Sequence, residues 1–149
     1  MGMWLLFAIL AAVFWGLDYA FAEKVFREVS VIGALALTTM AAGVVLTTVA
    51  LAIGRLQEDV HTLLGDPKTL LYLIISALAF VLADLLIGTS ITARNATLAS
   101  LVEISYPLFV ATFGYFVFGE RSLNAGVSIG GLLIMAGVAT IYVSSRGIR

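Results

Sequence analysis

The sequence predicts an all-α integral membrane protein with five transmembrane helices. Hydrophobic residues make up 62% of the chain and charged residues only 11%, whereas a typical soluble domain carries about 25% charged residues. The mean hydropathy is +1.12, and several apolar stretches reach the roughly 20 residues that a helix needs to cross the hydrocarbon core. Such a chain cannot cover a water-facing surface with polar groups. Its length of 149 residues therefore tells how many membrane-spanning helices it can form, and not how many soluble domains it contains.

The apolar stretches divide the chain into five spans. We expect a single transmembrane domain over residues 1–149, with spans at about 3–22, 30–53, 69–91, 96–118 and 125–144. The first stretch has the length of a full crossing and no basic segment before it. We therefore expect it to remain a helix of the mature protein and not to be a cleaved signal.

The connections between the spans carry helix-start signals. Ser30 is expected to cap the second span, and Asp66 followed by Pro67 is expected to open the third. Residues 92–95 are predicted to form a tight turn between the third and fourth spans. The segment between the second and third spans is predicted to form a short helix along the membrane interface. Its apolar residues at helical spacing are Leu56, Val60, Leu63 and Leu64.

Charge and cysteine usage exclude several kinds of function. The net charge is −1, and the eight Lys and Arg residues lie scattered near span ends, so no basic face is expected for a nucleic-acid partner. Cysteine is absent, which excludes a thiol nucleophile and a cysteine-based metal site. We expect no cofactor and no metal.

One match to a catalytic motif is better explained by helix packing. Residues 126–130 fit the G-x-S-x-G form of a hydrolase nucleophile elbow. They lie within an apolar helix, and the single histidine, His61, is expected outside the spans, in the connection between the second and third, so Ser128 lacks a base. We predict that the protein is not an enzyme, and that Gly126, Gly130 and Gly137 let another helix approach closely.

Three acidic residues inside the spans are the main candidates for function: Asp18, Asp84 and Glu103. An ionisable side chain in hydrocarbon costs several kcal/mol and is rare without a partner or a purpose. Asp84 and Glu103 lie equally far from the turn at residues 92–95, at a depth of roughly 14 Å, close to the middle of a roughly 30 Å core. Asp18 lies in the same half of the membrane, so the three acids could face one cavity.

A proline strengthens the case for Glu103. Pro107 cannot donate the backbone hydrogen bond to the carbonyl of Glu103, so a kink is expected beside this carboxylate. A kink and paired carboxylates near the midplane suit a proton or cation site, because close carboxylates raise one pKa. The alternative is that each acid is only hydrogen-bonded to Ser, Thr or Tyr on a neighbouring helix. A proton shared by Asp84 and Glu103 would satisfy either interpretation.

Several segments together resemble a known family. They are Phe14-Trp15-Gly16 followed by Lys24, then Ala99-Ser100-Leu101, Pro107-Leu108-Phe109 and Gly119-Glu120, and finally Gly126, Gly130 and Gly137. In these segments, and over nearly its whole length, the chain resembles the EamA domain of the drug/metabolite transporter superfamily, a five-helix unit that usually occurs twice per chain.

The resemblance implies a transporter whose central cavity is lined by the first four helices, with the fifth helix at the periphery. We expect the cavity to be lined by Trp15, Ser100, Tyr106 and Pro107. Asp18 and Glu103 occupy positions that vary in the family. Their charge is therefore a local feature of this chain, and the family's substrates are too diverse for the resemblance to name one.

The chain supplies one half of the usual two-half transporter, so we expect it to need a partner. One side of the membrane would carry Lys24, Arg27, Arg94, Arg146 and Arg149, and the other Arg55, Lys68 and Arg121. Five against three is a weak bias under the positive-inside rule, which permits insertion in both orientations. An antiparallel homodimer would then recreate an inverted repeat. If one orientation is chosen, the five-charge side is expected in the cytoplasm.

These observations lead to one functional hypothesis and two alternatives. We expect a secondary-active transporter in the cell membrane, compatible with a bacterial inner membrane, that moves a small organic solute or amphipathic cation. Glu103 and Asp84 would bind substrate or protons, with Asp18 assisting. The alternatives are a non-transporting accessory or scaffold protein, and a protein that moves lipid between leaflets.

Overall fold

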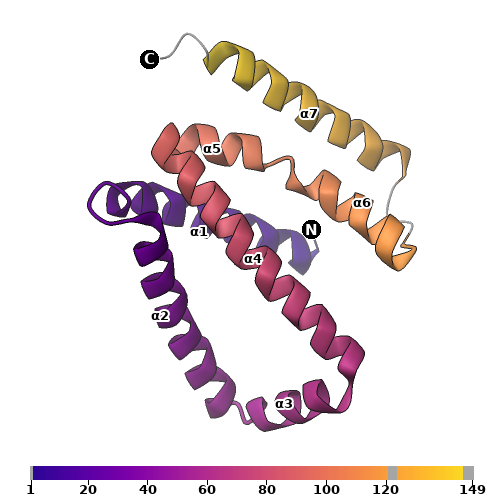
Figure 1. Cartoon of the computed structure of the whole chain (residues 1–149). Helices are drawn as coiled ribbons and strands as arrows, with labels where there is room; N and C mark the ends of the chain where they lie inside the picture. The colour runs from indigo at the N-terminus through magenta and orange to yellow at the C-terminus, as the bar shows by residue number, and fades with distance from the viewer. Residues whose placement is uncertain (1, 121–123, 146–149) are drawn as a thin grey trace. The chain divides into compact units, whose positions relative to one another are not determined.

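The computed structural model describes residues 2–120 and 124–145, and the regular structure in these ranges is α-helical (Figure 1). The helices are α1 (Met3–Val25), α2 (Val31–Ala52), α3 (Leu56–Gly65), α4 (Pro67–Ala93), α5 (Ala96–Glu103), α6 (Tyr106–Phe118) and α7 (Ala125–Ser145). Five segments are long and apolar enough to cross a membrane: α1, α2, α4, α5 with α6, and α7. The predicted fold class is therefore confirmed. Arg121, Arg146 and Arg149, which the charge count used, lie outside the described residues.

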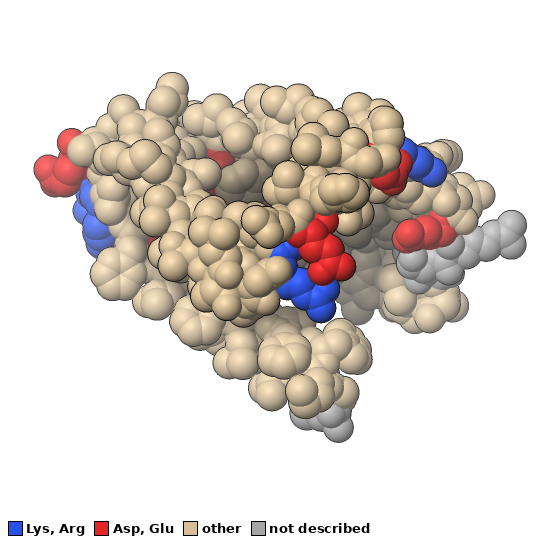
Figure 2. Space-filling view, turned by 90° about the horizontal axis from the view of Figure 1, so that it is seen from below, with Lys and Arg blue, Asp and Glu red and all other residues tan. Residues whose placement is uncertain are grey.

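The side chains of these helices are distributed as lipid contact requires. Large apolar residues are widely exposed, as shown by Phe116 at 78% and Leu132 at 71%. On the face drawn in Figure 2, Lys, Arg, Asp and Glu side chains occur in small separate groups on an otherwise uncharged surface. A water-soluble protein could not expose so much apolar surface without associating, so hydrocarbon is the solvent that suits these helices.

The chain forms two compact units. One contains Lys24–Thr89, which includes α2, α3 and most of α4. The other contains Met1–Glu23 and Ser90–Arg149, and its described helices are α1, the end of α4, α5, α6 and α7. The unit of α2, α3 and α4 is described first.

Local capping starts α2 and α4 where the sequence predicts. The Ser30 hydroxyl accepts the backbone N–H of Gly33 at 3.1 Å, and α2 begins at the next residue. The Asp66 carboxylate accepts the backbone N–H groups of Lys68 and Thr69 at 3.1 and 3.3 Å. Pro67 is the first residue of α4. Both predicted caps are confirmed.

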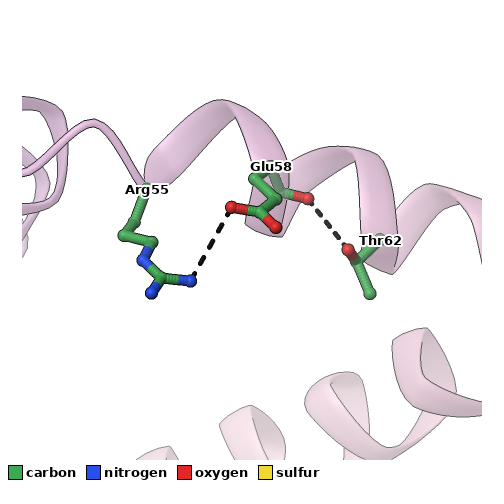
Figure 3. A network of polar contacts seen from close by, with 3 residues as sticks. All are labelled: Arg55, Glu58 and Thr62. Atoms are coloured by element: carbon green, nitrogen blue, oxygen red, sulfur yellow. Dashed lines mark hydrogen bonds and ion pairs between the residues drawn. The ribbon is translucent and has the colours of Figure 1, made fainter.

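The predicted short helix between the second and third spans is α3, which connects α2 with α4 (Figure 1). Its first turn is acidic, as the positive end of a helix dipole favours. The Arg55 guanidinium lies 3.7 Å from the Glu58 carboxylate, and the Thr62 hydroxyl donates to the Glu58 carbonyl at 2.9 Å. Figure 3 draws both contacts. Its position along the membrane interface stays a prediction.

At the opposite end of this unit α2 and α4 approach closely at Gly88, which is buried. A Cβ at Gly88 would lie 2.6 Å from a methyl group of Val31 and 3.4 Å from the ring of Phe26. Only glycine leaves room for this contact, so Gly88 fixes the point where the two helices meet.

In the other unit, the end of α1 is tied to the start of α5. The Glu23 carboxylate accepts the backbone N–H of Ala96 at 2.8 Å. Asn95 caps the same helix by accepting the N–H of Leu98 at 2.8 Å. The predicted turn at residues 92–95 is thus shorter in the structure, because α4 continues to Ala93 and α5 begins at Ala96.

Helix α7 packs against α5, and it approaches α6 at a glycine that the sequence did not single out. A Cβ at Gly131, which is buried, would collide with a methyl group of Leu108. Around Gly130 and Gly137 the single chain instead leaves open space, and near Gly126 only the side chain of Asn124 is close. The helix-packing role predicted for these three glycines stays a prediction.

Candidate functional site

The centre of the candidate site is a hydrogen bond between two helices. The Tyr19 hydroxyl of α1 donates to the Glu103 carboxylate of α5 at 2.6 Å, and both side chains are partly buried. Bonds from O–H to a carboxylate are among the shorter and stronger hydrogen bonds of proteins. In a membrane segment, such a bond offsets part of the cost of removing the carboxylate from water.

Glu103 lies where the fourth span is interrupted. It is the last residue of α5, and Ile104 and Ser105 separate α5 from α6; we call these two residues the α5–α6 joint. Hydrogen bonds to the third preceding residue occur at the joint, from Ser105 to Val102 and from Leu108 to Ser105, at 3.3 and 3.1 Å. Pro107 in the first turn of α6 lacks the N–H that would reach the Glu103 carbonyl. The kink that the sequence predicts at Pro107 is present.

The α1 side of the site is aromatic. The rings of Trp15 and Tyr19 lie 5.7 Å apart at an interplanar angle of 58°. Asp18 and Tyr19 follow Trp15 by three and four residues, the spacings that place side chains on the same side of a helix as Trp15. Asp18 is exposed, whereas Tyr19 is half-buried. The structure thus places two of the predicted residues, Trp15 and Asp18, on the stripe of α1 that carries the Glu103 contact.

The remaining residues predicted to line a cavity lie on either side of the α5–α6 joint. Ser100 is half-buried in α5, and its hydroxyl donates to the Thr97 carbonyl at 3.1 Å. Tyr106 begins α6 and is 60% exposed, and Pro107 is also exposed. Their role as cavity-lining residues stays a prediction.

Asp84 belongs to the other unit, where it lines a cavity between α2 and α4. The cavity holds about 380 Å³. It is lined by Ile32, Leu35, Ala36, Thr39 and Met40 of α2 and by Phe80, Val81, Asp84 and Leu85 of α4. The meeting of Asp84 with Asp18 and Glu103, and a proton shared by Asp84 and Glu103, stay predictions.

Sequence reasoning did not single out Tyr19, the direct partner of Glu103. A signal was present, because Tyr19 follows Trp15 by four residues and adjoins Asp18, so its hydroxyl falls within an apolar helix. A hydroxyl there needs a partner. Sequence reasoning did not single out Glu23 either, because no local pattern indicates that it caps a helix 73 residues away.

The arrangement is suited to proton exchange and to binding positive charge. A carboxylate takes up and releases a proton, a phenol hydroxyl donates to its charged form, and an indole ring offers its face to cations. Within residues 2–120 and 124–145, no group of three or more His, Cys, Asp or Glu side chains is placed to hold a metal ion.

Comparison with known proteins identifies the family. No curated protein and no solved structure matched the chain. The EamA-like transporter family matches residues 2–143, which covers all five membrane-spanning segments up to the last turn of α7. The family match agrees with the resemblance seen in the segments around Trp15, Pro107 and Gly119. The matched residues make up more than half of the chain. The chain therefore belongs to the EamA-like transporter family.

Proposed function

We propose that the protein is a secondary-active transporter that exchanges protons for a small organic solute or an amphipathic cation, working as an antiparallel homodimer. The observation that carries this proposal is the 2.6 Å hydrogen bond from Tyr19 to Glu103 beside the α5–α6 joint. It places an ionisable group at an interruption in a membrane helix. Interrupted helices form the substrate and ion sites of many secondary transporters.

The proposed exchange uses the two protonation states of Glu103. The charged carboxylate accepts the Tyr19 O–H and attracts a cation. When the carboxylate takes up one proton from one side of the membrane, its charge is lost and the attraction ends. One bound positive charge is then replaced by one proton, so the charge of the site is the same before and after the exchange. Asp18 lies on the same stripe of α1 and would add to the attraction for cations.

The number of spans supports the proposed homodimer. Five crossings give one half of a ten-helix arrangement, and two copies inserted in opposite directions would form an inverted repeat. In such repeats the substrate site lies near the bilayer midplane at the interface of the halves. The open space around Gly130 and Gly137 on α7 leaves room for a helix of a second copy.

The test replaces Glu103 with glutamine, which keeps the volume of the side chain and removes its charge. Liposomes containing the purified protein and an internal pH dye are exposed to a panel of small organic cations and zwitterions. We expect at least one to drive proton movement with the wild type and none with Glu103→Gln. Glu58→Gln serves as the matched control, because Glu58 lies on α3 and its side chain is 72% exposed.

The outcome that contradicts the proposal is proton movement that is unchanged in Glu103→Gln while the variant keeps its oligomeric state. A scaffold protein would be distinguished with the wild type alone. It would move no proton with any solute, and it would purify with a different partner chain.

A further inference from the structure

We infer that Glu23 is a positioning residue for the site at Glu103. It holds the start of α5 against α1, and so brings Glu103, at the other end of α5, to the Tyr19 hydroxyl. The inference rests on the proposed function, because it assigns a further residue to the same site. Its evidence is a second contact between the same two helices, in which the backbone N–H of Ala96 donates to the Glu23 carboxylate at 2.8 Å.

The two contacts join α5 to α1 at both ends of α5. Ala96 is the first residue of α5 and Glu103 is the last. Their partners on α1 are Glu23 and Tyr19, which are four residues apart and so lie on the same side of that helix. Because the later residue of α1 meets the earlier residue of α5, the two helices run antiparallel where they are joined.

The continuity of the chain does not by itself fix the position of α5. The helix has eight residues and is about 12 Å long. Before it α4 ends at Ala93, and after it comes the α5–α6 joint, where Pro107 cannot donate to the Glu103 carbonyl. A short helix with a break on each side can change its direction relative to the helices before and after it. Its contacts with other helices therefore decide where Glu103 lies.

The contacts of α5 with α7 and with α1 differ in kind. α5 packs against α7, whereas the hydrogen bonds at Glu23 and Glu103 attach it to α1. Apolar packing is not directional, but a hydrogen bond weakens steeply when its distance or angle departs from the best values. The two hydrogen bonds therefore fix how far α5 is advanced along α1.

The start of α5 is already capped without Glu23. The Asn95 side chain accepts the N–H of Leu98 at 2.8 Å, as the cap of a helix does. Glu23 adds a second acceptor, and its negative charge suits the positive end of the helix dipole. Beyond local capping, Glu23 supplies the attachment to α1, 73 residues away in the chain. Its removal should loosen α5 from α1 while the helix itself stays formed.

The first test measures proton movement in the liposomes described for Glu103→Gln. Glu23→Ala removes the acceptor, and we expect the rate to fall about fivefold or more. Glu23→Gln keeps a carbonyl oxygen that can accept the Ala96 N–H, so we expect it to recover most of the wild-type rate. Glu28→Ala is the matched control, because Glu28 is an exposed acid just beyond α1. It should stay within about twofold of the wild type.

A second variant removes the same hydrogen bond from its other side. Ala96→Pro deletes the N–H donor at the first position of a helix, where proline is well tolerated. Asn95 before it already has the extended backbone that a following proline requires. We expect Ala96→Pro to slow proton movement as Glu23→Ala does, and it keeps the inference testable should Glu23→Ala fail to fold.

The second test asks whether Glu23 acts through the Tyr19–Glu103 pair, and it needs no transport. Thermal unfolding in detergent is compared for the wild type, Tyr19→Phe, Glu23→Ala and the double variant. If Glu23 positions Glu103, the Tyr19 hydroxyl contributes less in the Glu23→Ala protein. The lowering of Tm by Tyr19→Phe should then be at least about halved, whereas two independent contacts would give additive shifts.

Three results overturn the inference: a wild-type rate in Glu23→Ala, a rate in Glu23→Gln as low as in Glu23→Ala, and additive shifts of Tm. The second of these would show that the charge of Glu23 acts, and not the attachment. The proposed function fails separately. Shifts of Tm that are not additive, in a protein that moves no proton with any solute, would support the role of Glu23 in placing α5 and contradict the transport function. Proton movement that depends on Glu103, together with additive shifts, contradicts only the role of Glu23.

Discussion

The contact between Tyr19 and Glu103 joins α1 to α5 through two side chains that are 84 residues apart in the sequence. Each side chain alone would bring a polar group into an apolar helix. In the pair, the Tyr19 hydroxyl donates to the Glu103 carboxylate, so each side chain gives the other a polar partner. The pair is therefore both a structural link and the reactive centre that we propose.

Replacing Tyr19 with phenylalanine tests the link at the level of one hydroxyl. The ring contact with Trp15 can persist, but the O–H donated to Glu103 is lost. A hydrogen bond to a charged group contributes about 1.5–3 kcal/mol, so we expect proton-coupled uptake in liposomes to slow by about tenfold or more. Tyr115→Phe is the control, because Tyr115 is exposed and its ring can keep the edge contact with Phe116. Equal rates for the two variants would contradict the role of the hydroxyl.

Asp66 gives a pH-dependent prediction outside the membrane segments. The Thr69 hydroxyl and the backbone N–H of Lys68 donate to its carboxylate and lower the pKa of Asp66 below its ordinary value. Because the pKa is lowered in the folded state, the stabilisation by this cap is complete above the ordinary aspartate pKa. It is lost as the pH falls through the lowered value.

We therefore expect Asp66→Ala to lower the unfolding temperature at neutral pH and to lie closer to the wild type as the pH falls below the aspartate range. Asp66→Asn keeps an acceptor without an acidic group, so it should show no acid transition at this position. Thermal unfolding in detergent across a pH series measures both effects. A difference between Asp66→Ala and wild type that is the same at every pH would show that the charge is not involved.

Some of these contacts could be predicted from the sequence and others could not, for a physical reason. Ser30 and Asp66 were predictable as caps because a cap acts within three residues of itself. The break before Pro107 was predictable because proline lacks the N–H that would bond to the Glu103 carbonyl. The partner of Glu103 was not, because a hydrogen bond between distant segments depends on how α1 and α5 pack, and no local pattern specifies that packing.

At the scale of elements, two glycines control helix contacts in different ways. Gly88 faces Val31, whose branched side chain is stiff, and Gly131 faces Leu108, whose end can rotate away. The helix-packing prediction named other glycines of α7: Gly126, Gly130 and Gly137. Spacing shows where small residues recur, but it does not show which of them faces a neighbour.

These contacts predict opposite outcomes for the same substitution. Gly88→Ala should destabilise the fold by about 1–3 kcal/mol, because the added methyl overpacks a rigid contact. Gly131→Ala should remain within about 1 kcal/mol of the wild type, because Leu108 can shift and alanine favours the helix by about 1 kcal/mol. Thermal unfolding in detergent compares the two. A larger loss for Gly131→Ala would contradict the assigned contacts.

At the scale of the whole molecule, orientation in the membrane decides whether two identical copies can form an inverted pair. The chain has no cysteine, so a single one can be introduced at a chosen place. Ser145 ends α7, and Gln57 lies in α3 after the second span. With five crossings these two positions lie on opposite sides of the bilayer.

Intact cells carrying Ser145→Cys or Gln57→Cys are labelled with an impermeant maleimide before and after permeabilisation. We expect each variant to label to roughly half of its final extent before permeabilisation, because the five-to-three charge bias barely selects an orientation. Full labelling of one variant and none of the other would exclude an antiparallel pair. A parallel dimer or a different partner chain would then remain.

The number of membrane segments was predictable because each apolar helix satisfies its own backbone hydrogen bonds. Each one can therefore be recognised in the sequence without knowledge of the others. The cavity lined by Asp84 was not predictable in that way. It exists because the two helices that meet at Gly88 leave space further along their length, and that depends on their crossing and on α3. Asp84 was identified from its cost in hydrocarbon, without the residues that surround it.

The α5–α6 joint also makes the fourth span sensitive to the thickness of the membrane. With 8 residues in α5 and 13 in α6, and a rise of about 1.5 Å per residue, the two rods are about 12 and 20 Å long. Each is shorter than the roughly 30 Å core. The other spans can adjust to a thinner or thicker bilayer only by tilting as whole rods, whereas this one can bend at the joint. Lipid chain length would then act directly on the surroundings of Glu103.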